Sequence, residues 1–169
     1  MKTTGKYIIR FFILLFAFFF QSSPIMDKLS VAGATPNIVF TILLVFSLYL
    51  KDKEVVTYAL IIGSFTDIMF GKIYGITTLL LIAFVCIYIL LNKYIYAESR
   101  TIVSVYCMIS TVAYELLNYL INMALWGEKI SFAVAIKLIV VKSLYNAVVI
   151  LPTFYIARKV HRAKQEVHF

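Results

Sequence analysis

The sequence predicts an all-α membrane protein built as a bundle of six transmembrane helices. Three observations lead to this class. Of the 169 residues, 63% are hydrophobic and 14% are charged, whereas a soluble domain is nearer half apolar and a quarter charged. Apolar runs long enough to span a bilayer recur along the chain, and their connections are short. Because no Gly/Ser- or Pro-rich linker interrupts these runs, we expect one integral membrane domain over residues 1–169.

The six predicted spans follow from the requirement for about 20 mainly apolar residues per membrane helix. They cover residues 7–26, 34–50, 55–71, 75–92, 101–125 and 132–156. The first resembles a signal peptide, but the nearest small-residue cleavage pattern, Ala32 to Ala34, lies too far beyond it, so we expect an uncleaved span. The second is short, with Pro36 near its start, where a missing N–H does no harm. It could be tilted, re-entrant, or extended back through residues 31–35.

The distribution of basic residues predicts the topology. Short loops make sequential helices antiparallel. With a cytoplasmic N-terminus, eleven of the 16 Lys and Arg residues fall in inner segments, three in outer loops and two within the last span. This bias predicts that both termini are cytoplasmic. The net charge of +8 comes from these short clusters and from a basic tail suited to anionic lipid, so we expect no nucleic-acid partner.

The sequence contains no recognisable catalytic motif. Cys86 and Cys107 lie in apolar runs, and no Cys/His spacing indicates a metal site. No nucleophile–base pair or phosphate loop is visible. We therefore expect neither catalysis nor a metal or cofactor.

Four ionisable residues lie inside predicted spans, where an unpaired charge costs about 2.5–3.5 kcal/mol. A helical rise of 1.5 Å per residue puts Asp67 about 6 Å and Lys137 about 8–10 Å below the outer ends of their spans. Glu115 and Lys142 both lie about 15 Å deep or slightly more. We therefore expect two ion pairs, Asp67 with Lys137 and Glu115 with Lys142. These could fix helix order, or they could line a path for a proton or small molecule.

A stripe of small residues surrounds the first of these acids. In "GSFTDIMFGKIYG", Gly63, Asp67, Gly71 and Gly75 recur every four residues. Glycines at this spacing let helix backbones approach closely, and those near a turn can serve backbone conformation. Neither role explains Asp67. A second polar stripe on the fifth span consists of Thr111, Glu115, Asn118 and Asn122.

Taken together, these motifs resemble the MreD family, the integral membrane subunit of the bacterial rod-shape machinery. The resemblance rests on Pro36 at the start of an apolar span and on the short loop "KDKE". It also rests on the Gly-x-x-x-Asp segment that ends in glycines, and on Asn146 in "SLYNAVVILPTFYIARKV". The likeness covers nearly the whole chain.

The resemblance implies a non-catalytic scaffold in the bacterial cytoplasmic membrane that helps organise peptidoglycan synthesis and cell shape. It would bind MreC, and through MreC it would associate with MreB, RodA and a class B penicillin-binding protein. Its six-helix bundle would be similar to the substrate-binding subunits of energy-coupling-factor transporters. That similarity supplies an alternative, a small-molecule-binding membrane subunit of a transporter. Lys137 and Lys142 depart from the purely apolar last span expected of the family. A ligand cavity near them therefore stays an alternative interpretation. Neither the partner-binding face nor the stoichiometry follows from the sequence.

Overall fold

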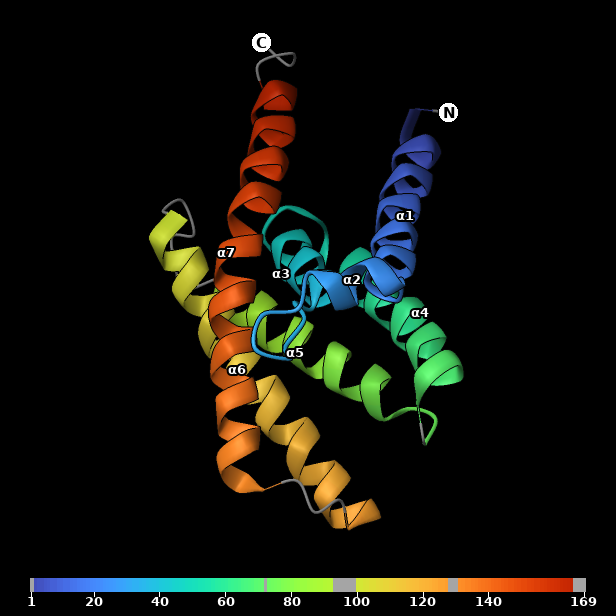
Figure 1. The fold of residues 1–169 in the computed structure, drawn as a ribbon. Coiled ribbons are helices and arrows are strands. Elements are labelled where there is room, and N and C mark those ends of the chain that lie inside the picture. Colours follow the sequence, from blue (N-terminus) through green and yellow to red (C-terminus); the bar gives the residue numbers. More distant parts are fainter. Residues whose placement is uncertain (1, 72, 93–99, 128–130, 166–169) are drawn as a thin grey trace.

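The computed structural model describes residues 2–71, 73–92, 100–127 and 131–165, and this part of the chain folds into helices (Figure 1). In chain order the helices are α1 (Lys2–Gln21), α2 (Pro24–Lys28), α3 (Ile38–Tyr49), α4 (Asp52–Phe70), α5 (Ile76–Asn92), α6 (Arg100–Trp126) and α7 (Phe132–Gln165). The predicted all-helical class is confirmed, and each predicted span range carries a helix. The predicted connections at residues 93–99 and 128–130 lie outside the described residues.

Two helical stretches are long and apolar enough by themselves to cross a membrane, Thr101–Leu125 of α6 and Phe132–Arg158 of α7. The apolar stretches Tyr7–Gln21, Ile38–Tyr49 and Ile76–Asn92 are shorter. The number of six spans therefore stays a prediction.

The first predicted span, 7–26, is broken in the structure. Helix α1 ends at Gln21, and a new helix, α2, starts at Pro24. The Ser23 hydroxyl accepts a hydrogen bond from the Ile25 N–H at 3.1 Å and so caps α2. Proline has no N–H to continue the preceding helix but suits the first position of a new one, which explains the break.

Helix α3 begins four residues later than the predicted second span, because Asn37 caps it. The Asn37 side chain accepts from the Phe40 N–H at 3.0 Å, and Pro36 precedes this cap. The 12 residues of α3 rise roughly 18 Å, less than the roughly 30 Å of a hydrocarbon core. The chain reaches α3 through a non-helical segment, residues 29–37, which contacts α7 where the Tyr145 hydroxyl donates to the Leu29 carbonyl at 3.0 Å.

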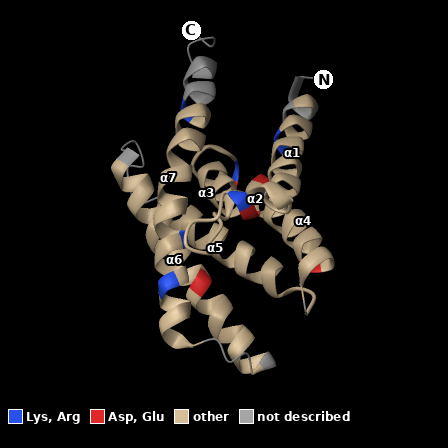
Figure 2. Cartoon of the chain, in the orientation of Figure 1, with Lys and Arg blue, Asp and Glu red and all other residues tan. Residues whose placement is uncertain are grey.

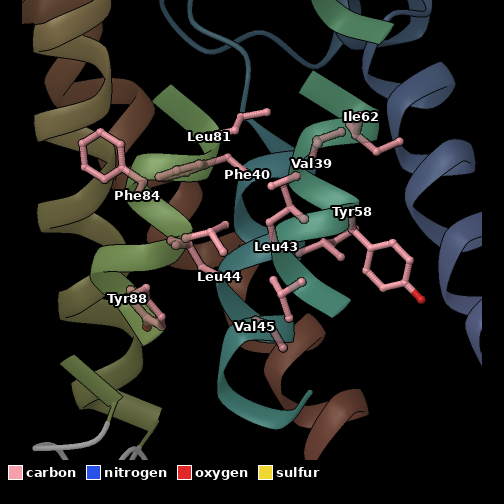
Figure 3. Packing of buried hydrophobic residues seen from close by; sticks show 14 of the residues in the cluster. Val39, Phe40, Leu43, Leu44, Val45, Tyr58, Ile62, Leu81, Phe84 and Tyr88 are labelled. Atoms are coloured by element: carbon pink, nitrogen blue, oxygen red, sulfur yellow. The ribbon is translucent and has the colours of Figure 1, made fainter. Parts of the chain in front are cut away.

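The core forms around α3, which packs against α1, α4, α5 and α7. Eight of its twelve residues are buried. At the centre the Phe40 ring contacts Tyr114 of α6 and Phe84 of α5, with centroids 4.8 and 5.9 Å apart. Figure 3 shows the labelled α3 side chains reaching toward α4 on one side and α5 on the other. Burying these residues against each other leaves the outer faces of the surrounding helices apolar and exposed.

Two antiparallel hairpins flank this core, α4–α5 and α6–α7. In Figure 1 the second half of α6 and the first half of α7 project away from the other helices. Charged positions are few along the described helices and separated by long uncharged stretches (Figure 2). The start of α1 and the C-terminal part of α7 lie at the same end of the molecule in this view.

Candidate functional site

The buried carboxylate of Asp67 caps the N-terminus of the neighbouring helix. Asp67 lies in the last turn of α4 and is 3% exposed. Its Oδ2 accepts from the Gly75 N–H at 3.0 Å, the Thr78 N–H at 2.9 Å and the Thr78 hydroxyl at 2.6 Å. Its Oδ1 accepts from the Thr77 N–H at 3.0 Å. The acid therefore satisfies backbone donors that the first turn of α5 leaves without helical partners, and its charge lies at the favourable end of that helix.

The glycines of the stripe complete this corner between α4 and α5. A Cβ on Gly63 would lie 2.7 Å from the Thr78 Cα, so α4 and α5 touch backbone to backbone here. A Cβ on Gly71 would lie 2.5 Å from the Asp67 carbonyl oxygen. Gly75 has φ +100°, a conformation that favours glycine. The stripe thus holds the chain's own hairpin together.

The expected pairing of Asp67 with Lys137 does not occur among the residues that the structure describes. The donors around Asp67 come from the start of α5, and Lys137 is exposed on α7. Lys137 lies five residues after the first residue of α7, roughly 8 Å along the helix. A long lysine side chain near a helix end can extend to the interface, so it needs no buried acid.

The structure does bring Glu115 and Lys142 together. Lys142 Nζ lies 2.9 Å from Glu115 Oε2, across the α6–α7 contact. The side chains are 30% exposed for Lys142 and 11% for Glu115. On the same stripe of α6, the Asn122 Nδ2 donates to the Asn118 Oδ1 at 3.0 Å. The pair joins two helices that follow each other in sequence.

Asn146 lies in a buried amide network at the start of α3. Its side chain is fully buried; Oδ1 accepts from the Asn37 N–H at 2.8 Å, and Nδ2 donates to the Thr111 hydroxyl oxygen at 3.2 Å. The Gln21 side chain accepts from the Val39 N–H at 3.0 Å. Because α3 starts inside the protein, side-chain amides from α1 and α7 take the place of water at its first N–H groups.

The structure contains an ion pair that the sequence did not predict, between Arg10 and Glu54. Arg10 Nη1 of α1 lies 2.6 Å from Glu54 Oε1 of α4, which also accepts from the Tyr58 hydroxyl at 2.9 Å. In the sequence, Arg10 is one of the inner basic residues that indicate topology, and Glu54 is the last residue of the short loop "KDKE". The acidic first turn of α4 and the basic side of α1 were visible, but nothing in the sequence aligned two residues 44 positions apart.

The α4–α5 corner also presents an apolar and aromatic surface, which we call the corner surface. Its members are 40–69% exposed: Phe65, Ile68, Met69, Phe70, Ile73 and Tyr74. The corner surface lies on the same segment as the Asp67 carboxylate, whose bonds fix the turn. The hydrogen bonds from Gly75, Thr77 and Thr78 to Asp67 join the two helix ends that carry this surface.

A small cavity of about 10 Å³ lies between α3, α5 and α6, lined by Leu48, Tyr88, Val103 and their neighbours. A space of this size holds about one water molecule, whereas small-molecule sites measure roughly 300–1,000 Å³. Within the described ranges, no three His, Cys, Asp or Glu side chains gather as metal ligands.

Comparison with known proteins adds one match. The family described as rod shape-determining protein MreD matches residues 1–161. No curated protein and no solved structure shows a significant match.

Proposed function

The chain belongs to the MreD family of rod shape-determining membrane proteins, and from this premise we propose that it is a non-catalytic scaffold that binds MreC. Through MreC it would take part in organising peptidoglycan synthesis together with MreB, RodA and a class B penicillin-binding protein. The observation that carries the proposal is the α4–α5 corner, where a buried acid fixes a turn beneath an exposed apolar surface.

The α4–α5 corner has buried residues that shape it and exposed residues that can contact a partner. Asp67 and Gly63 are buried and contact their own hairpin, so neither is available to a partner. Ile68 and Tyr74, by contrast, are 69% and 65% exposed. Without a hydrophobic driving force inside lipid, association between membrane segments depends on close packing and hydrogen bonds, and both require a well-defined surface. We therefore assign shape to the buried residues and contact with MreC to the corner surface.

The proposal includes a topology. Six spans with both termini in the cytoplasm would place the α4–α5 corner at the outer face of the membrane, where Tyr74 suits the interface. The short α3 would cross only part of the bilayer. In the non-helical segment before it, Ala34 and Pro36 are buried, whereas residues 29–33 are exposed. Non-helical backbone at membrane depth is tolerated where protein covers it, so residues 34–37 would lie within the bilayer and residues 29–33 at its surface. The bundle would then be similar to the substrate-binding subunits of energy-coupling-factor transporters.

Co-purification tests the assignment. MreC from the same organism is co-expressed with the wild-type chain and with Ile68→Ala, Tyr74→Ala or Val148→Ala. Val148 is the matched control, because it is 64% exposed but lies on α7. Recovery of MreC per folded chain should fall for the two corner variants and stay at the wild-type level for Val148→Ala. Equal recovery from all four chains would refute the corner as the MreC surface.

The alternative, a solute-binding transporter subunit, is not favoured by any observation among the described residues. It predicts that a small molecule raises the thermal stability of the purified chain by mass action. A scaffold should instead gain stability when MreC is added.

A further inference from the structure

The projecting half of the α6–α7 hairpin has few neighbours among the residues that the structure describes. The buried residues of α6 are Val103, Cys107, Thr111 and Tyr114, and none of the residues from 115 to 125 is buried. Taken as a whole, α6 packs mainly on α7. The outward faces carry exposed apolar side chains, including Leu117, Leu120 and Val140. Lipid would cover such side chains without difficulty.

The polar side chains on this half, unlike the apolar ones, are not readily covered by lipid. Glu115 lies ten residues before Leu125, and Lys142 lies ten residues after Phe132, the two ends of the candidate membrane stretches that meet at the closed end of the hairpin. Both are therefore about 15 Å from that end, near the middle of a hydrocarbon core about 30 Å thick. Lys142 is nevertheless 30% exposed.

The neighbouring amides have unused hydrogen-bonding capacity. The Asn122 Nδ2 donates to the Asn118 carbonyl and side-chain oxygens at 2.7 and 3.0 Å. Within the described residues, the Asn118 Nδ2 and the Asn122 Oδ1 have no hydrogen-bond partner. Asn118 lies seven residues before Leu125, roughly 10 Å from the end of the stretch, and Asn122 lies three residues before it, roughly 4–5 Å. Hydrocarbon offers no hydrogen bonds, and polar groups as deep as Glu115, Lys142 and Asn118 normally face protein or a wet cavity. The hairpin therefore needs a polar surface against it.

We propose that a second copy of this chain provides that surface, with the two α6–α7 hairpins forming a four-helix contact. The argument is charge complementarity. Glu115 and Lys142 lie at one level on adjacent antiparallel helices, so a two-fold axis parallel to the hairpin sets α6 of one copy against α7 of the other. Each lysine then lies beside the glutamate of both copies, and four charges alternate around the axis. A different partner would have to carry its own matched acid and base at the same depth.

Charge reversal in trans tests this contact separately from the ion pair within one chain. Glu115→Lys places two lysines in each hairpin, and Lys142→Glu places two glutamates. Each variant alone should lose about tenfold or more in dimer association, because like charges meet across the axis. Co-expression of the two variants should restore mixed dimers, since each copy then brings the charge that the other lacks. A purely internal ion pair cannot be rescued by mixing.

The readout is bismaleimide crosslinking in native membranes, in a full-length chain carrying Cys86→Ser and Cys107→Ser. Leu125→Cys reports on the contact, because Leu125 is 54% exposed and lies one turn after Asn122 on the same stripe. Leu79→Cys is the matched control, being 70% exposed on α5. We expect a dimer band from Leu125→Cys and little from Leu79→Cys.

Matched variants of the other ion pair complete the design. Arg10→Glu and Glu54→Arg reverse the α1–α4 pair, and neither should change the Leu125→Cys dimer. Three results would overturn the proposal: no dimer with the unaltered charges, equal bands from both cysteine positions, or no rescue on mixing. A Leu125→Cys crosslink to a different protein instead of a second copy would overturn it as well. If a reversal variant does not fold, the comparison of the two cysteine positions still decides the question.

Discussion

Removing the Asp67 carboxylate should loosen the α4–α5 corner, and the structure allows the effect to be worked out. Asp67→Ala leaves three backbone N–H groups and one hydroxyl without their acceptor. Thr78 is 8% exposed, so its N–H and hydroxyl stay buried. An unsatisfied buried donor costs about 1–3 kcal/mol. The half-buried amides of Gly75 and Thr77 recover some solvent and contribute less. We expect a loss of about 2–5 kcal/mol in unfolding free energy, including the lost charge–dipole attraction.

Two milder variants should lose less unfolding free energy than Asp67→Ala, with Asp67→Asn losing more than Thr78→Val. Asp67→Asn keeps an oxygen at the Oδ2 position, where three of the four donors meet, but sets an NH₂ group against the Thr77 N–H. We expect a loss of about 1–2 kcal/mol. Thr78→Val removes only the hydroxyl donor and should cost about 0.5–1.5 kcal/mol. Asp27→Asn, at an exposed acid on α2, is the matched control and should stay within about 0.5 kcal/mol of the wild type.

The assay is thermal unfolding in one detergent, with backbone hydrogen exchange at Gly75, Thr77 and Thr78. The melting temperature should fall by roughly 2–4 °C for each kcal/mol, and exchange at these three amides should speed up most in Asp67→Ala. The reasoning is refuted if Asp67→Ala has the same melting temperature as the wild type, or if Thr78→Val lowers the melting temperature more than Asp67→Ala does.

Two further predictions concern the other buried contacts. Gly63→Ala should lower the melting temperature, with a loss of about 1–3 kcal/mol, because its Cβ would meet the Thr78 backbone at 2.7 Å. Gly5→Ala, which meets nothing within 4 Å, should be neutral or stabilising in the same measurement. Asn146→Leu should cost about 1–3 kcal/mol by leaving the Asn37 N–H unpaired. Faster hydrogen exchange at Asn37 should accompany that loss, and unchanged exchange there would contradict the assignment.

Hydropathy predicted the places of the helices because each apolar run must be covered by lipid or protein. The helix ends depended on caps. Asn37 followed by an apolar run is a recognisable N-cap signal, but the predicted span starts at residue 34, with Pro36 near its start. At Pro24 the break between α1 and α2 was also readable from "QSSP". In both places, local hydrogen bonds decided the boundary over the apolar pattern.

The polar contacts were predictable only in part. Glu115 and Lys142 lie on consecutive antiparallel helices, so a depth estimate was enough to match them. Asp67 was different, since three of its four donors are backbone N–H groups, which every residue but proline carries. The depth estimate for Asp67 therefore agreed with that for Lys137, although Lys137 is exposed in the structure and does not contact Asp67. Gln21 and Arg10 were missed for a related reason: their partners lie on helices whose packing the sequence does not reveal.

The central claim is that Asp67 shapes the α4–α5 corner and that MreC contacts the corner surface. Hydrogen exchange of the whole chain, measured with and without MreC bound, tests it most directly. The account predicts slower exchange on binding in peptides that cover residues 65–78, with little change in residues 132–145. Slowing on α7 alone, or no change at residues 65–78 in a stable complex, would contradict it.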